Sequence, residues 1–234
     1  MTTASTLMPD DELLAIGEEL TPLPTYKLAS TTLLSFDNLL DPPLKLHEDL
    51  SAGCGGQLWP AGMVLAKHLL RYHSEAMARA RILELGAGGG LVGLAVALAC
   101  RPQEPVFITD QTPMLKLMRQ NIALNLLESR VNEFLLDWGS PLPTEIVEFC
   151  PNVILAADCV YFEPAFPLLL ATLEALVKLC EETVIYFCFK RRRRADMQFL
   201  KQAKKKFQVD EIEDEDREIF SRERLFLYTF RRKM

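Results

Sequence analysis

Residues 81–93 read Arg81-Ile-Leu-Glu-Leu-Gly-Ala-Gly-Gly-Gly-Leu-Val-Gly93. The apolar start of this stretch predicts a buried strand over 82–85, and the glycines predict a tight turn that continues as a helix of small residues. Glycines lack the Cβ atom that would keep a ligand away from the backbone, and they tolerate positive φ values. The stretch therefore predicts a loop that cradles a nucleotide-containing ligand. Gly88, Gly90 and Gly93 also fit the G-x-G-x-x-G pattern of NAD sites, so the loop alone leaves the ligand open.

The sequence around this loop alternates strand patterns with helix patterns, which is typical of a parallel sheet with crossover helices. Two further strands follow a basic helix, and because only a charged loop joins them they should pair antiparallel. We predict an α/β fold with a seven-strand sheet that is mostly parallel and has an antiparallel closing strand. The expected strands span residues 82–85, 106–109, 132–136, 153–157, 183–189, 207–212 and 225–230, and the main helices 61–72, 90–100, 112–126 and 166–180.

The first eighty residues are less regular. Acidic residues early in the segment 10–20 predict a short amphipathic helix, and 26–36 predicts a strand or hairpin. Asp41-Pro-Pro43 then interrupts the chain. We divide the protein into an N-terminal appendage, residues 1–52, that covers the mouth of the sheet, and a main domain, residues 53–234.

Composition limits the class of protein. A chain of 234 residues with 49% apolar and 25% charged side chains fits one globular domain. Its apolar runs fall short of the roughly 20 residues of a membrane helix, and its N-terminus lacks a basic signal-peptide region, so we expect a cytoplasmic monomer. The net charge of −6 does not favour a nucleic-acid partner. The cysteines form no C-x-x-C pair and the histidines no ligand spacing, so we expect no metal.

Carboxylates follow several of the predicted strands. In an open α/β sheet the ligand lies beyond the carboxyl ends of the strands, so these side chains should meet in space. Asp110 lies about twenty residues after the glycines, where an acid can accept the hydroxyls of a ribose, or it could cap the following helix. Trp138 could cover an adenine ring or pack on a neighbouring helix, and Asp137 could accept the adenine amino group or cap a turn.

The segment after the fourth strand, Ala157-Asp-Cys-Val-Tyr161, resembles the acid-x-x-aromatic motif of protein lysine methyltransferases. These enzymes are a branch of the seven-strand S-adenosylmethionine-dependent methyltransferases, which have a Rossmann-like fold. Three other segments resemble the same branch: Glu84-Leu-Gly-Ala-Gly88 its cofactor loop, Leu58-Trp59-Pro-Ala-Gly62 its upstream tryptophan, and Asp137-Trp138-Gly139 its adenine clamp. The resemblance extends from Gly53 to Phe189.

The resemblance implies S-adenosyl-L-methionine as the cofactor and a protein lysine as the acceptor. It assigns the cofactor contacts to Trp59, Glu84, Gly86, Ala87, Gly88, Asp110, Asp137, Trp138 and Ala157. It also places two catalytic residues in the lysine channel, Asp158 to hydrogen-bond the incoming ammonium and Tyr161 to orient the side chain. The alternatives are structural, with Asp158 as a helix N-cap and Tyr161 packed near Pro164. We interpret Phe162 and Phe166 as core residues.

Gly53-Cys-Gly-Gly56 with Leu58-Trp59 is most similar to fungal enzymes that methylate a lysine of translation elongation factor 1-alpha, which makes that factor the expected partner. The basic run Lys190-Arg-Arg-Arg-Arg194 could be a solvated surface or could dock an acidic face of this target. Three rival functions are kept. They are a nucleic-acid or small-molecule methyltransferase, an NAD oxidoreductase, and an inactive binding protein. Amino-group methyltransferases that act on bases usually carry Pro-Pro-aromatic after the fourth strand, where this chain has Asp158-Cys-Val-Tyr161.

Overall fold

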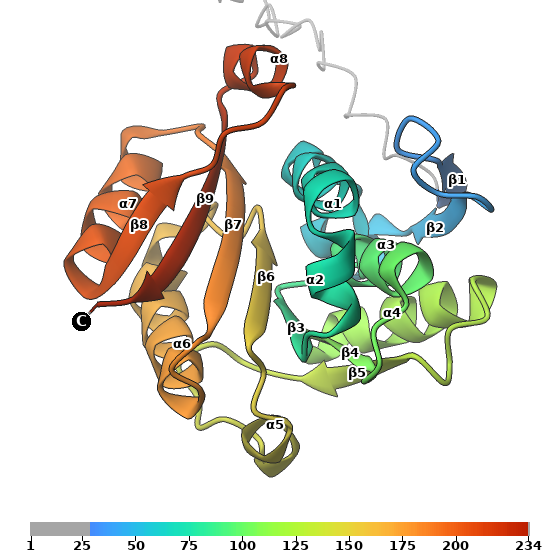
Figure 1. The fold of residues 1–234 in the computed structure, drawn as a ribbon, viewed down its shortest axis with the longest axis horizontal. Coiled ribbons are helices and arrows are strands. Elements are labelled where there is room, and N and C mark those ends of the chain that lie inside the picture. The colour runs from blue at the N-terminus through green and yellow to red at the C-terminus, as the bar shows by residue number, and fades with distance from the viewer. Residues whose placement is uncertain (1–28, 234) are drawn as a thin grey trace, which may run out of the picture.

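The computed structural model describes residues 29–233, and at its centre lies a seven-stranded sheet with helices on both faces (Figure 1). The spatial order of the strands is β5-β4-β3-β6-β7-β9-β8. The five strands from β5 to β7 are parallel, and β9 pairs antiparallel with both β7 and β8. The strands are β3 (Ile82–Leu85), β4 (Val106–Asp110), β5 (Val131–Leu135), β6 (Val153–Ala157), β7 (Val184–Lys190), β8 (Phe207–Glu211) and β9 (Leu225–Arg232).

The chain changes direction across the sheet after β5. From β3 it proceeds outward through β4 to β5, and it then returns to place β6 on the other side of β3. All four residues of β3 are buried, as expected for a parallel strand covered on both faces. The gap between the carboxyl ends of β3 and β6 is thus a topological switch point, where open α/β sheets bind their ligands.

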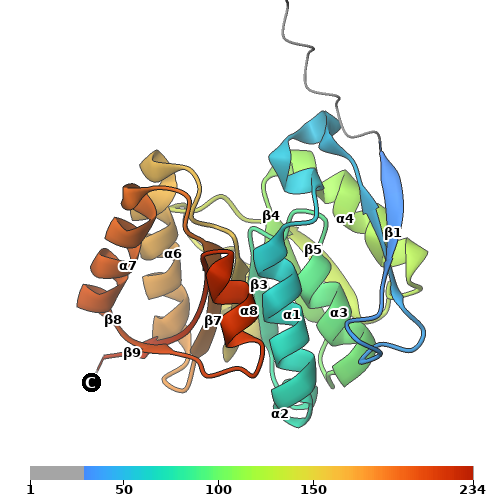
Figure 2. The ribbon, with the colours of Figure 1, turned by 90° about the horizontal axis from the view of Figure 1, so that it is seen from above.

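Helices cover the two faces in separate groups (Figure 2). One group packs in a core with β3, β4 and β6, and consists of α1 (Pro60–Tyr72), α2 (Ser74–Ala78), α3 (Leu91–Cys100) and α4 (Thr112–Leu124). The other consists of α5 (Thr144–Phe149), α6 (Phe166–Leu179) and α7 (Arg194–Lys206). Eight of the ten residues of α3 are buried, because this helix is apolar on all sides. No helix within residues 29–233 is long and apolar enough to cross a bilayer.

A separate hairpin, β1 (Ser30–Leu34) and β2 (Leu44–Glu48), lies against α4. Asn121 of α4 accepts from the backbone N–H of His47 at 2.8 Å and donates to its carbonyl at 3.1 Å, and Asn125 pairs with Lys45 in the same way. Two 3-10 turns, η1 (Leu50–Ala52) and η2 (Cys54–Gly56), connect β2 to α1. The hairpin shares the core of α1 and α3, and the division of the chain at residue 52 stays a prediction.

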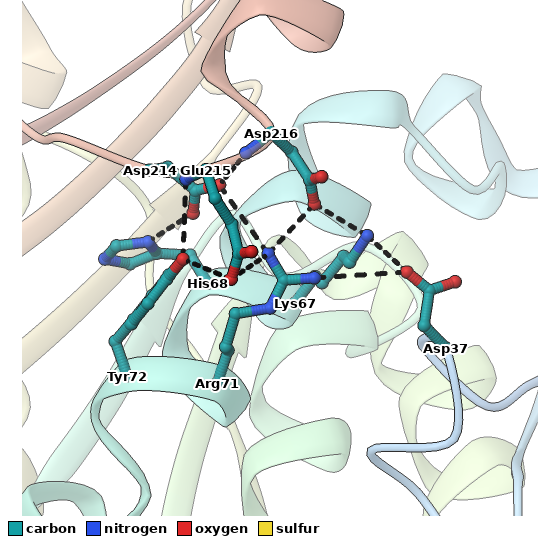
Figure 3. A network of polar contacts seen from close by, with 8 residues as sticks. All are labelled: Asp37, Lys67, His68, Arg71, Tyr72, Asp214, Glu215 and Asp216. Carbon is teal, nitrogen blue, oxygen red and sulfur yellow. Dashed lines mark hydrogen bonds and ion pairs between the residues drawn. The ribbon is translucent and has the colours of Figure 1, made fainter.

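Charged contacts tie α1 to the segment before α8 (Arg217–Arg222), as Figure 3 shows. His68 Nδ1 lies 2.7 Å from Asp214 Oδ2, and both side chains are buried. Lys67 Nζ lies 2.7 Å from Asp216 Oδ2 and also pairs with Asp37, which precedes β2. Residues from the two ends of the described chain therefore meet on one helix.

The predicted order of the seven strands along the chain is confirmed, with ends that differ by one or two residues. The pattern did not predict the short helices α2, α5 and α8, which have only five or six residues each. The loop expected between β8 and β9 contains α8. Residue 29 begins the described part of the expected strand or hairpin at 26–36, and the helix predicted at 10–20 lies outside the described residues.

Candidate active site

A cavity of about 700 Å³ opens at the carboxyl ends of β3, β4 and β6. This volume is typical of a small-molecule site. Its walls come from the glycine loop after β3, the loops after β4, β5 and β6, the turn η2 and the first residues of α1. Every residue that the sequence assigned to the site lines this cavity: Trp59, Glu84, Gly86, Ala87, Gly88, Asp110, Asp137, Trp138, Ala157, Asp158 and Tyr161.

The glycine loop is closely approached from two sides. A Cβ atom on Gly88, where φ is +56°, would lie 2.3 Å from the carbonyl oxygen of Gly55 in η2. A Cβ on Gly86 would lie 2.9 Å from the indole ring of Trp138. Gly93 faces the interior instead, since its Cβ would lie 2.4 Å from Ile108 of β4. Of the G-x-G-x-x-G pattern, only Gly88 lines the cavity wall, where Gly86 accompanies it. The second and third glycines, Gly90 and Gly93, pack against Ile108 of β4 instead.

The buried side chain of Glu84 stabilises the glycine loop through a hydrogen bond. Its Oε2 accepts from the backbone N–H of Gly93 at 2.7 Å, across the turn and into α3. The side chain is fully buried, and this burial raises the pKa of Glu84 to about 8 against the backbone hydrogen bonds that favour the carboxylate. Glu84 therefore fixes the distance between the end of β3 and the start of α3.

Asp110 links the ends of β3 and β4. Its Oδ2 accepts from the N–H of Gly88 at 2.7 Å, and its Oδ1 accepts from the N–H of Gln111 at 2.7 Å. Burial raises its pKa, while these two hydrogen bonds act in the opposite direction. The N-cap of α4 is Gln111, so the alternative of Asp110 as that cap is wrong. Each oxygen retains a lone pair for a ligand hydroxyl.

Trp138 and Asp137 form the wall after β5. Trp138 is half-buried, because one side of its indole packs with the α6 core and another part lines the cavity beside Gly86. The following N–H, from Gly139, donates to Thr172 Oγ1 of α6 at 2.8 Å and fixes this loop. Asp137 is exposed at the cavity wall. Trp138 thus both packs on the neighbouring helix, as one alternative expected, and lines the cavity.

Asp158 has an unusual backbone and a strong partner. Its φ is +55°, and its N–H donates to the Cys188 carbonyl of β7 at 2.8 Å. Its side chain is only 4% exposed and receives both arms of the Arg192 guanidinium, Nη1 to Oδ1 at 2.8 Å and Nη2 to Oδ2 at 2.6 Å. The N-cap position of the next helical turn, η3 (Glu163–Ala165), is Phe162, so the alternative of Asp158 as its N-cap is wrong.

Arg192 is the site residue that the sequence did not reveal. It follows β7 and reaches back into the cavity, where its guanidinium carbon lies 5.2 Å from the centre of the Trp59 ring. The indole N–H of Trp59 in turn donates to the Cys54 carbonyl at 3.0 Å. The basic run 190–194 is thus not a uniform outer surface. Arg191, its neighbour, lies over the Phe226 ring and does not line the cavity.

Two aromatic residues follow Asp158 at the mouth. Tyr161 is 49% exposed, so it is not simply packed near Pro164, and partial burial raises the pKa of its hydroxyl to about 12. Phe162 is 56% exposed and lines the cavity, so its interpretation as a core residue is wrong. The turn η3 separates it from Phe166, which is 3% exposed and packs on Phe199 of α7 as expected.

Seven strands in this order, with a glycine-cradled cavity at the switch point, define the class of S-adenosyl-L-methionine-dependent methyltransferases. The cavity fits this cofactor, because glycines admit a ligand to the backbone, Asp110 keeps free acceptor sites and an indole offers a flat face. Residues 38–206 match the model of a family described as lysine methyltransferase, and the chain belongs to that family. It is a protein-lysine N-methyltransferase, which decides against the three rival functions.

Relatives support this assignment over most of the chain. The protein-lysine N-methyltransferase EFM6 of Saccharomyces cerevisiae is 37% identical, and the alignment covers 93% of this chain and 97% of the yeast protein. The protein N-lysine methyltransferase METTL21A of Danio rerio is 34% identical over 75% of this chain and 80% of its own. An O-methyltransferase family protein of Burkholderia thailandensis shares the fold, with a TM-score of 0.51 at 16% identity over 74% of this chain and 55% of that one.

Proposed function

We propose that this enzyme methylates a lysine side chain of translation elongation factor 1-alpha. The observation that carries the proposal is the segment Gly53-Cys-Gly-Gly56 with Trp59, on which the resemblance to enzymes for that factor rests. All five residues line the cavity, and Gly55 lies directly against the glycine loop. The position of this segment at the cavity supports the proposal that it helps to select elongation factor 1-alpha as the substrate.

Within the cavity we assign the roles as follows. Asp110 accepts the ribose hydroxyls, Trp138 and Asp137 hold the adenine, and the loop 86–88 receives the amino-acid end of the cofactor together with Trp59. Asp158 and Tyr161 line the channel through which the lysine enters. The positions of these side chains around one cavity support the assignment, because they surround it from four strand ends.

S-adenosyl-L-methionine supplies a methyl group on a cationic sulfur, and its leaving group is a neutral thioether. The acceptor must be an uncharged amine, whose lone pair forms the new N–C bond while the S–C electrons stay with sulfur. A lysine with a pKa near ~10.4 in water is protonated at pH 7, so the site must favour loss of that proton to solvent. Tyr161 and Phe162 narrow the mouth with aromatic surface, which removes water from the lysine stem and aligns it.

The same proposal covers the rest of the protein. Residues 1–52 act as a lid and substrate region over the mouth, and the enzyme works as a monomer in the cytoplasm, where translation takes place. The β1–β2 hairpin supports a role at the cavity, because Asn121 bonds both His47 of β2 and the Gly89 carbonyl of the glycine loop.

The test is to incubate the purified protein with radiolabelled S-adenosyl-L-methionine and an extract from cells depleted of methyl donors. We expect one labelled protein band, which mass spectrometry identifies as elongation factor 1-alpha with a methylated lysine. The control is Trp138→Ala, which keeps the sheet but should lose most of the label. Label on another protein, on RNA or on small molecules would refute the assignment of this substrate.

A further inference from the structure

One permanent cation faces the cavity. Among the described residues that line it, Arg192 is the only lysine or arginine, whereas four carboxylates line the same space. Its side chain is 31% exposed, and the carboxylate it grips is 4% exposed. The charged head thus lies at the boundary between the cavity and the protein interior, close to the proposed lysine channel.

The position of Arg192 is fixed by its backbone as well as its side chain. Asp196 of α7 is fully buried, and its Oδ2 accepts from the N–H groups of Arg192 at 2.7 Å and Arg193 at 2.8 Å. Arg193 also donates to the Tyr161 carbonyl, so the two arginines hold the segment 158–161 from one side. Bidentate guanidinium–carboxylate pairs are among the strongest polar contacts and fix the orientation of both groups.

This arrangement bears on the charge of the acceptor lysine. An unpaired carboxylate at position 158 would attract an ammonium group and favour the protonated form, which cannot attack a methyl group. A carboxylate already paired with a guanidinium exerts little such attraction. Asp158 also has both oxygens engaged, since the Lys190 N–H donates to Oδ1 at 3.2 Å in addition to the guanidinium.

We propose that Arg192 is a positioning residue of the methyl transfer, which holds Asp158 in place and cancels its charge so that the substrate lysine enters as the free amine. The inference rests on the lysine methylation of this enzyme class and not on the identity of the protein that carries the lysine. For Arg192, this role in the cavity replaces the suggestion that the basic run 190–194 docks an acidic face of the target protein.

Other ionisable groups surround Arg192, and their contribution to the pH dependence of the rate has to be distinguished from that of Arg192. Asp158, in the loop after β6, and Asp196, in α7, act directly on its guanidinium, and Tyr161 and Cys54 line the same cavity. The remaining ionisable residues of the cavity wall are His47, Glu84, Asp110, Asp137 and Cys159. A matched variant that leaves all of these in place is available one residue away, because Arg191 has the same charge but lies outside the cavity.

The experiment compares Arg192→Gln with Arg191→Gln in the full-length protein. Initial rates of label transfer are measured from pH 6 to 10, at saturating S-adenosyl-L-methionine, into saturating amounts of whichever protein the wild type labels, purified from the methyl-depleted extract. For Arg192→Gln we expect the acidic limb of the kcat profile to move up by about one pH unit, with rates that approach the wild type at high pH. Arg191→Gln should leave the acidic limb at the wild-type pH. Arg192→Lys should place the limb between the positions found for the wild type and for Arg192→Gln.

A uniform loss of rate at every pH would overturn the inference, since it would indicate a structural role alone. If Arg192→Gln proves insoluble because a buried carboxylate is left unpaired, the double variant Asp158→Asn/Arg192→Gln decides instead. It removes both charges, so its limb should lie at the wild-type pH even where its maximal rate is lower. A limb displaced upward in the double variant would contradict charge cancellation. Binding of S-adenosyl-L-homocysteine, measured by calorimetry, confirms in each case that the cavity is folded.

Discussion

Replacing Gly88 with alanine should damage both the fold and cofactor binding. Gly88 has a φ of +56°, which costs a residue with a Cβ about 1–2 kcal/mol. The new Cβ would also lie 2.3 Å from the Gly55 carbonyl oxygen, about 1 Å inside ordinary contact, and relief of such overlap adds about 1–3 kcal/mol. The free energy of unfolding should therefore fall by about 2–5 kcal/mol.

The binding effect follows from which atoms must move. Gly55 can yield only by moving η2 away from the glycine loop, which opens the cavity wall, so the affinity for S-adenosyl-L-methionine should fall by at least about tenfold. Urea unfolding and calorimetry measure the two quantities. The control is Gly89→Ala, which has no positive φ. The nearest atom to its Cβ would be the Asn121 side-chain amide nitrogen at 3.1 Å, with its other neighbours in ordinary contact at 3.8 Å, so it should cost less than about 1 kcal/mol. A Gly88→Ala protein with wild-type stability and affinity would refute this reasoning.

Further substitutions test the other parts of the site. Asp110→Asn should weaken cofactor binding about tenfold by calorimetry, because a carboxamide offers one acceptor oxygen where Asp110 uses two for backbone N–H groups. Glu84 has a pKa raised from 4.5 to about 8 in the folded protein, so the unfolded chain holds fewer protons between these values and stability should fall as pH rises through them. Urea titrations at pH 5 and pH 8 should show this loss in the wild type, by more than about 1 kcal/mol, and not in Glu84→Gln. Phe162→Ala should change the free energy of unfolding by less than about 0.5 kcal/mol while it lowers kcat/KM, whereas Phe166→Ala should cost about 3 kcal/mol in thermal or urea unfolding.

The features that sequence predicted best depend on local pattern. Apolar runs define the strands, and a carboxylate directly after a run marks the edge at which ligands bind, so Asp110 and Asp158 could be assigned to one site before any coordinates. The glycines after β3 predict that another group closely approaches the backbone of this loop, although they do not identify the approaching atom. That atom is the carbonyl oxygen of Gly55, which comes from an irregular turn more than thirty residues earlier.

Contacts between distant residues account for what the sequence did not predict. Arg192 lies 34 residues after Asp158, within a run whose charge density suggests a surface, and no periodicity distinguishes it from Arg191. Phe162 and Phe166 are four residues apart with the same side chain, and only the turn between them sends one to the cavity and the other to the core. Short helices such as α8 have too few residues for a periodic pattern to emerge.

The position of β9 inside the sheet has a consequence for biosynthesis. Seven residues of β7 pair with β9, and β8 is joined to the sheet through β9 alone, although β8 is made first. While the ribosome is translating residues 191–224, the aromatic strand β7 is an open sheet edge, and such edges recruit strands from other chains. Fragments that stop before residue 225 should therefore aggregate during expression, even though they contain every residue that lines the cavity.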